Sequence, residues 1–176
     1  QSIVSQESVD GVEIVAHDSV LHIALDRPAR KNALDAAAIA RIVRALEAAA
    51  VDESLRAVVV RSTGDDFCAG ADWVATNNAK DARPRTGSIQ RRTPHQAHRL
   101  IELLVEIHLP VVCAVRGSAA GLGCQIARAA DFTVATAPLC DTMLMPPFRG
   151  GVRMAPVQHT APVVKLMKPR QLGPSS

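Results

Sequence analysis

The chain has 176 residues, of which 48% are hydrophobic and 21% charged, so it is long enough for one domain with a buried core and too apolar for general disorder. It has three Phe, one Trp and no Tyr, which argues against the stacking surfaces that bind single-stranded nucleic acid. No apolar run reaches the roughly 18 residues of a membrane span, and the first residues show no signal-peptide pattern, so we expect a cytoplasmic protein without membrane or nucleic-acid partners.

The net charge of +3 is unevenly distributed. Residues 142–176 carry five Lys and Arg and no Asp or Glu, whereas the other 141 residues carry 15 Lys and Arg against 17 Asp and Glu. The positive excess belongs to the C-terminal segment and does not indicate a nucleic-acid-binding face.

The first predicted element is an antiparallel hairpin. Residues 12–16 and Val20–Leu25 are short apolar runs around a turn-forming His-Asp-Ser trio. Pro28 ends the pairing and introduces a cationic loop, residues 27–34.

A helix and a strand are predicted next. Asp35 is placed to cap a helix that runs to about Ala50 and presents Arg41, Arg44 and Glu47 to water. Residues 55–60 read as a short strand, which favours a right-handed βαβ crossover. Ligands in such folds collect beyond the carboxyl ends of strands, where residues 62–73 stand. The apolar face of the helix would hold Ile39, Ile42, Val43, Leu46 and Ala50.

The middle of the chain predicts a loop and a second helix. Residues 75–92 are polar and aperiodic, as in a mobile loop. Thr93 and Pro94 form a good helix start, and the helix should run to about Ile107. Its apolar face would hold Ala97, Leu100, Ile101, Leu104 and His108.

Val111–Val115 reads as a strand that leads through Gly117 and a tight turn into a helix from about Gly121, before another short strand over residues 130–135. The first N–H groups of a helix lack intrahelical partners and suit a negative oxygen. A buried strand-to-helix connection that needs small residues explains the same pattern, so this stretch alone leaves both interpretations open.

The C-terminal segment differs from the rest of the chain in its proline content and hydrophobic pattern. Residues 142–176 contain six of the eleven prolines and show no helical period. We therefore expect a core over residues 1–140 and a segment, residues 141–176, that is diverged, truncated or read from a shifted frame. Four widely spaced cysteines with apolar neighbours predict buried, reduced thiols rather than a zinc site: Cys68, Cys113, Cys124 and Cys140.

Three segments stand in a suggestive order: residues 27–34 (RPARKNAL), residues 67–72 (FCAGAD), and residues 117–125 (GSAAGLGCQ) followed by Ala-Ala-Asp at 129–131. Together they resemble the crotonase superfamily, whose commonest members are enoyl-CoA hydratases and isomerases. The resemblance covers about residues 12–137. It implies an α/β fold built as a spiral of ββα turns, with an incomplete C-terminal helical region here. It also implies an acyl-CoA ligand, no separate cofactor or metal, and a homotrimer or hexamer.

The resemblance also implies roles for individual residues. The backbone N–H groups of Ala71 and Leu122 would form an oxyanion hole for the thioester oxygen of the fatty acyl-CoA. The CoA moiety would meet the side chains of Arg30 and Lys31 and the backbone around the Asn-Ala-Leu loop. Asp72 would fix its loop. The remaining residues implied at the CoA site are Asn32, Ala33, Ala69, Gly70 and Gly121.

The sequence departs from the hydratase pattern at both acid/base positions. Hydratases of this family use two glutamates, and the first position is occupied by Gln125, whose amide can position water but cannot exchange a proton near pH 7. The second position falls around residues 146–148, where no carboxylate stands. No catalytic role is assigned to the other candidates, Asp72, Asp131, Asp141, His95 and His98.

Three hypotheses follow. The chain is a hydratase-like or isomerase-like enzyme that retains the oxyanion hole, a non-catalytic acyl-CoA-binding protein, or an inactive paralogue. Turnover of a short enoyl-CoA would indicate the enzyme, and binding of a CoA ester without turnover would indicate the binding protein. Absence of binding would indicate the inactive paralogue.

Overall fold

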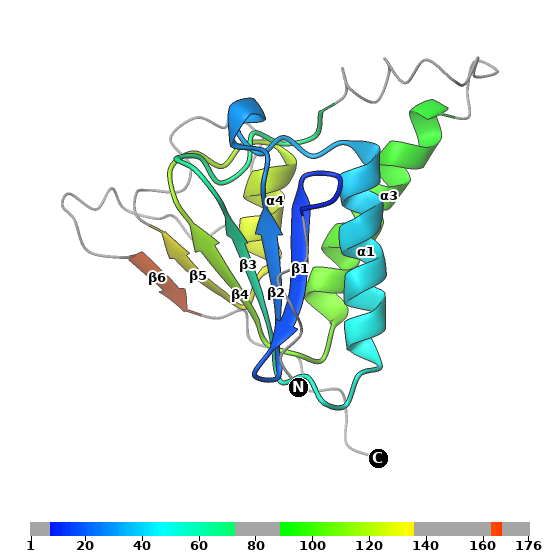
Figure 1. Cartoon of the computed structure of the whole chain (residues 1–176), viewed down its shortest axis with the longest axis vertical. Helices are drawn as coiled ribbons and strands as arrows, with labels where there is room; N and C mark the ends of the chain where they lie inside the picture. The colour runs from blue at the N-terminus through cyan, green and yellow to red at the C-terminus, as the bar shows by residue number, and fades with distance from the viewer. Residues whose placement is uncertain (1–7, 73–88, 136–162, 167–176) are drawn as a thin grey trace, which may run out of the picture.

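The structure is a computed structural model that describes residues 8–72, 89–135 and 163–166. A six-stranded sheet in the order β1-β2-β3-β4-β5-β6 forms its centre, and the mixed α/β architecture confirms the predicted class (Figure 1). The strands are β1 (Val12–His17), β2 (Val20–Leu25), β3 (Ala57–Ser62), β4 (Val111–Val115), β5 (Phe132–Ala135) and β6 (Val163–Leu166). The helices are α1 (Ala36–Ala50), α3 (Ile89–Glu106) and α4 (Leu122–Ala129), with a short 3-10 turn, η1 (Pro28–Arg30).

The predicted hairpin is confirmed. Strands β1 and β2 pair antiparallel from Val12 opposite Leu25 to His17 opposite Val20. The two connecting residues, Asp18 and Ser19, both have positive φ angles, as the right-handed twist of a two-residue hairpin requires. The expected parallel crossover from β2 to β3 is also present, and β4 and β5 continue the parallel sheet.

Apolar side chains on one face of the sheet form the core with the helices. Alternate strand residues such as Ile23, Val58 and Val111 are fully buried, and they belong to one cluster with Ile39 of α1 and Leu100 of α3. Figure 1 shows α1 and α3 next to each other and α4 behind the strands. None of the helices in the described part of the chain is long and apolar enough to cross a bilayer.

Helix α1 forms as its sequence predicts, with one exception. The Asp35 carboxylate accepts a hydrogen bond from the N–H of Ala38, and Ile39 and Leu46 are buried. The expectation that Arg41 points to water is wrong. Its side chain is half-buried, and its Nε has no hydrogen-bond partner among the described residues.

Helix α3 begins at Ile89, so the predicted start at Thr93 is wrong and residues 89–92 are helical rather than loop. Pro94 therefore stands inside the helix, where it has no N–H to donate to the carbonyl oxygen four residues earlier. The rest of the predicted loop, residues 75–88, lies outside the described residues. The face of α3 also differs, because His108 is exposed beyond the helix end and Leu103 is buried in its place.

The C-terminal segment contributes a strand that the sequence did not predict. Strand β6 pairs antiparallel with β5, with Phe132 opposite Leu166, and forms the far edge of the sheet in Figure 1. Residues 136–162 and 167–176 lie outside the described part. The predicted boundary at residue 140 therefore stays a prediction.

A tight contact joins α4 to the segment that follows β3. A Cβ atom on Gly123 would lie 2.5 Å from the backbone oxygen of Cys68 and 2.6 Å from its Cβ. Cys68, Cys113 and Cys124 are buried and not disulfide-bonded, as predicted, and Cys140 lies outside the described residues. Burial raises the pKa of the Cys68 thiol to about 11, so this side chain packs as a neutral group.

The cap of α1 leads to a first prediction. Asp35→Ala should lower the free energy of unfolding by about 1–2 kcal/mol, because it removes both the cap and the ion pair in which Arg27 Nη1 lies 2.9 Å from Asp35 Oδ2. Asp35→Asn keeps a capping oxygen and serves as the control, with a smaller expected loss. Urea denaturation followed by circular dichroism measures both, and equal losses would show that the ion pair dominates.

The contact at Gly123 leads to a second prediction. Gly123→Ala should destabilise the protein by about 1–3 kcal/mol through overpacking against Cys68, although alanine favours a helix over glycine by about 1 kcal/mol. The matched control is Arg128→Ala on the exposed side of α4, with an expected change within about 0.5 kcal/mol. A Gly123→Ala protein at least as stable as the natural chain would contradict the contact.

Candidate active site

Three loops leave the carboxyl ends of neighbouring parallel strands and meet at one edge of the sheet. We call them the first loop (residues 26–35, after β2), the second loop (residues 63–72, after β3) and the third loop (residues 116–121, after β4). Because β2, β3 and β4 run parallel, the three loops are neighbours.

Backbone hydrogen bonds join the second loop to the third. The N–H groups of Phe67 and Cys68 donate to the Ser118 oxygen at 3.0 and 3.2 Å. In return, the N–H of Ala120 donates to the Cys68 oxygen at 2.9 Å. These bonds and the Gly123 contact fix the second loop against the start of α4.

The first loop holds the second from the other side. The N–H of Ala69 donates to the Lys31 oxygen at 2.9 Å, and the N–H of Leu34 donates to the Gly70 oxygen at 2.8 Å. The N–H of Asp72 donates to the Leu34 oxygen at 2.7 Å. Ala71 and Leu34 thus form an isolated parallel β-bridge. The hydrogen bonds of this bridge are made by the residues on either side of Ala71, Gly70 and Asp72.

The buried side chain of Asn32 fixes the conformation of the first loop through hydrogen bonds. Its side chain is 1% exposed, and its Oδ1 accepts from the N–H of Arg27 at 2.7 Å. Its Nδ2 donates to the oxygens of Thr63 and Asp66, both at 2.8 Å. The side chain therefore makes its contacts inside the protein, and any ligand contact at Asn32 falls to the backbone.

Asp72 of the second loop is buried beside two arginines of the first loop, Arg27 and Arg30. Its Oδ2 lies 2.8 Å from Arg30 Nη2 and 3.9 Å from Arg27 Nη2. Arg27 also donates to the Ala33 oxygen and pairs with Asp35, so it links three parts of the loop. The sequence did not single out Arg27, because an arginine beside a proline is an ordinary surface pattern.

The predicted phosphate-binding side chains lie at the surface. Arg30 and Lys31 are exposed, as is Ala69, while Ala33 is half-buried. Arg30 is partly engaged by Asp72, and Lys31 Nζ lies 3.9 Å from Asp66 Oδ2. Both cations thus stand beside the edge at which the loops meet.

Gly70, the residue before Ala71, packs against the start of α4. A Cβ atom on Gly70 would lie 3.5 Å from the Leu122 nitrogen and 3.0 Å from the Ala120 oxygen. Gly70 has φ +101° and Gly121 has φ +52°, conformations that favour glycine. Leu122 is the first residue of α4, and in the part of the chain described neither N–H makes a hydrogen bond. The second loop and the first residue of α4 are therefore in contact next to both of these N–H groups.

The remaining candidates lie apart from these donors or have other partners. Gln125 is exposed on α4, one turn after Leu122. Asp131 Oδ2 accepts from the N–H of Val111 at the start of β4, and His98 Nε2 lies 3.0 Å from Glu102 Oε1. His95 is exposed on α3, while Asp141 and residues 146–148 lie outside the described residues.

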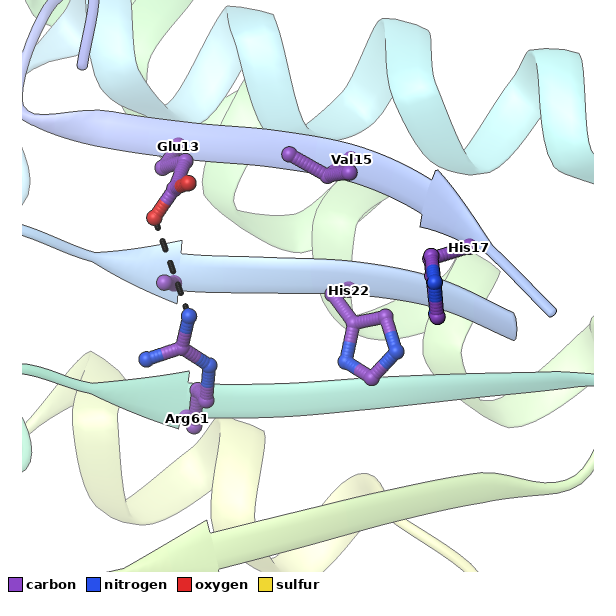
Figure 2. Close-up of a pocket in the computed structure, with 6 residues that line it drawn as sticks. Glu13, Val15, His17, His22 and Arg61 are labelled. Atoms are coloured by element: carbon purple, nitrogen blue, oxygen red, sulfur yellow. Dashed lines mark ion pairs between the residues drawn. The ribbon is translucent and has the colours of Figure 1, made fainter. Parts of the chain in front are cut away.

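A shallow hollow lies elsewhere, on the face of the sheet opposite the core (Figure 2). It crosses β1, β2 and β3, and Glu13 Oε2 lies 3.7 Å from Arg61 Nη2 at one end. Its other lining residues are Val15, His17, His22 and Ala24, and it contains none of the predicted site residues.

Comparison with known proteins connects the loops to one family. The family model for enoyl-CoA hydratase/isomerase matches residues 15–138. The chain is 34% identical over 116 residues to the 2,3-dehydroadipyl-CoA hydratase of Escherichia coli K12, covering 66% of this chain and 42% of that protein. It is 30% identical over 117 residues to the 1,2-epoxyphenylacetyl-CoA isomerase of the same organism, covering 66% and 44%.

A solved structure agrees with the sequence relatives. An enoyl-CoA hydratase/isomerase from Xanthobacter autotrophicus Py2 superimposes with a TM-score of 0.63 at 31% identity, covering 73% of this chain and 47% of that one. The chain spans less than half the length of the two curated relatives. The fold and the match over residues 15–138 show that the chain belongs to the enoyl-CoA hydratase/isomerase family of the crotonase superfamily.

Proposed function

We propose that this chain binds a CoA thioester and polarises its carbonyl group between the backbone N–H groups of Ala71 and Leu122. The observation that carries the proposal is the approach of Gly70, which directly precedes Ala71, to the Leu122 nitrogen at the carboxyl-end edge of the parallel strands. The names of the two Escherichia coli relatives, both of which act on CoA thioesters, support the ligand class.

The proposed chemistry is stabilisation of an enolate. When a thioester is converted to its enolate, negative charge collects on the carbonyl oxygen. Two preorganised N–H donors, one at the positive end of α4, stabilise that charge without rearranging. Removal of one such donor typically costs about 2.7–4 kcal/mol of barrier.

The CoA moiety is proposed to lie along the first and second loops. Arg30 and Lys31 would face its phosphates, and the backbone at Asn32, Ala33 and Ala69 would contact the remainder. Because CoA is part of the substrate, the proposal needs no separate cofactor. A homo-oligomer remains part of the proposal by family resemblance.

The proposed activity is limited by the lack of a side chain at position 125 that can transfer a proton. A glutamine amide neither gives nor takes a proton near pH 7, so Gln125 can only orient water or substrate. This residue favours a second candidate function, acyl-CoA binding without efficient hydration. The two functions share the oxyanion hole and differ in turnover.

A proline at position 122 tests the hole directly. Leu122 is the first helical residue, where proline fits and its missing N–H takes no intrahelical hydrogen bond. Leu122→Pro therefore removes the proposed donor, whereas Leu122→Ala removes the same side chain and keeps the N–H. Calorimetric titration should show that Leu122→Pro weakens acetyl-CoA binding by about twofold to tenfold relative to Leu122→Ala.

The matching ligand control is S-ethyl-CoA, a thioether without the carbonyl oxygen. Its affinity should be the same for Leu122→Pro and Leu122→Ala. An acetyl-CoA affinity that is also equal in the two variants would rule out the Leu122 donor.

Turnover separates the two candidate functions. Hydration of a short 2-enoyl-CoA should be about 10²–10⁴-fold slower than with the Escherichia coli hydratase, because general acid/base catalysis typically contributes that factor. Hydration at the rate of that relative would refute the role given to Gln125. Absence of any thermal stabilisation by acetyl-CoA would refute ligand binding itself.

A further inference from the structure

We propose that Ser118 and Asp66 form a clamp that sets the spacing between the two N–H donors, which makes Ser118 a positioning residue for the thioester carbonyl. The inference rests on the proposed function and concerns a residue of the third motif segment, residues 117–125, to which the resemblance gives no role.

Ser118, an exposed loop residue, makes four hydrogen bonds to the second loop. Its N–H donates to Asp66 Oδ1 at 3.2 Å, and its hydroxyl donates to the same oxygen. Its carbonyl oxygen accepts from the N–H groups of Phe67 and Cys68. Ser118 of the third loop is therefore hydrogen-bonded to the second loop through both its backbone and its side chain.

Asp66 is held in place from the other side through its backbone. Its backbone oxygen accepts from Asn32 Nδ2, and Lys31 Nζ lies 3.9 Å from its Oδ2. The hydrogen bond from the Ser118 side chain lowers the pKa of Asp66, so the charged carboxylate is the form that binds Ser118. The clamp thus connects the third loop to the fixed part of the first.

The neighbouring backbone leaves no room for the loops to approach further. A Cβ atom on Gly117 would lie 1.8 Å from the Asp65 oxygen, and Gly117 has φ +64°. The loops are already in contact beside the clamp. Loss of the Ser118 hydroxyl therefore allows them only to separate.

The clamp and the two donors lie on the same pair of segments. Asp66 precedes Ala71 by five residues, and Ser118 precedes Leu122 by four. Between them stand the hydrogen bond from Ala120 N–H to the Cys68 oxygen and the close approach of Gly70 to the Leu122 nitrogen. A change in spacing at Ser118 is carried to the donors, and displacements of about 1 Å can cost about 100-fold in rate.

The chain contains a matched control for this chemistry. Ser54 donates through its N–H and its hydroxyl to Asp52 Oδ1, at 2.9 and 2.6 Å, with the same pattern as Ser118 and Asp66. That pair lies between α1 and β3, away from the three loops. Ser54→Ala therefore removes a serine-to-aspartate hydrogen bond at an exposed site within a single loop, without touching the donors.

The test compares Ser118→Ala, Ser118→Thr and Ser54→Ala by calorimetric titration with acetyl-CoA and S-ethyl-CoA. We expect Ser118→Ala to lose about twofold to tenfold in affinity for acetyl-CoA and to keep its affinity for S-ethyl-CoA. Ser118→Thr should restore the preference, because it keeps the hydroxyl, and Ser54→Ala should behave as the natural chain. Melting temperatures of the two alanine variants should agree.

The outcomes are distinguishable from failure of the proposed function. If Ser118→Ala keeps the natural preference for acetyl-CoA while Leu122→Pro loses it, the clamp is overturned and the oxyanion hole stands. If neither variant changes that preference, both proposals fail. If Ser118→Ala weakens both ligands equally, or melts well below Ser54→Ala, Ser118 serves the fold alone and the inference is wrong.

Discussion

The packing of Cys68 against Gly123 is the constraint on which the candidate site depends. The start of α4 at Leu122 lies beside the second loop because that loop comes within van der Waals distance of the helix backbone. Any side chain at position 123 would occupy the space of Cys68. Hydrogen bonds in both directions between Cys68 and the third loop then fix the register of the contact. The proposed donors inherit their geometry from this backbone contact and not from side chains of their own.

Charge at the surface of the site is organised around the first loop. Asp72 is buried and would be costly as an unpaired carboxylate, and Arg27 and Arg30 compensate it. The same loop exposes Lys31 and part of Arg30. An anionic ligand would therefore meet Lys31 and an Arg30 that is held by the buried Asp72, on a loop whose backbone is fixed by Asn32. This arrangement limits the freedom of long cationic side chains, whose ordering would otherwise oppose binding.

Local signals explain why much of the fold could be predicted from the sequence. The hairpin at Asp18 and Ser19, the cap at Asp35 and the strand-turn-helix around Gly121 are each encoded within a few residues. The start of α3 was missed because an interior proline mimics a helix start. Strand β6 was missed because four apolar and charged residues among prolines acquire their structure only by pairing with β5. Contacts over long separations, such as Asn32 with Asp66 or Ser118 with Asp66, leave no periodic trace in the sequence.

The family motifs indicated the two proposed donors, whereas the contacts that hold their segments together became visible only in the structure. In the proposed function, Gln125 separates thioester polarisation from water addition, since the proposed backbone donors do not depend on its side chain. The most direct measurement is a crystal structure of the chain with a bound acyl-CoA thioester. The account predicts the carbonyl oxygen at about 2.7–3.1 Å from the nitrogens of both Ala71 and Leu122. A bound thioester whose carbonyl oxygen contacts neither nitrogen, and is hydrogen-bonded to water or to a side chain instead, would contradict it.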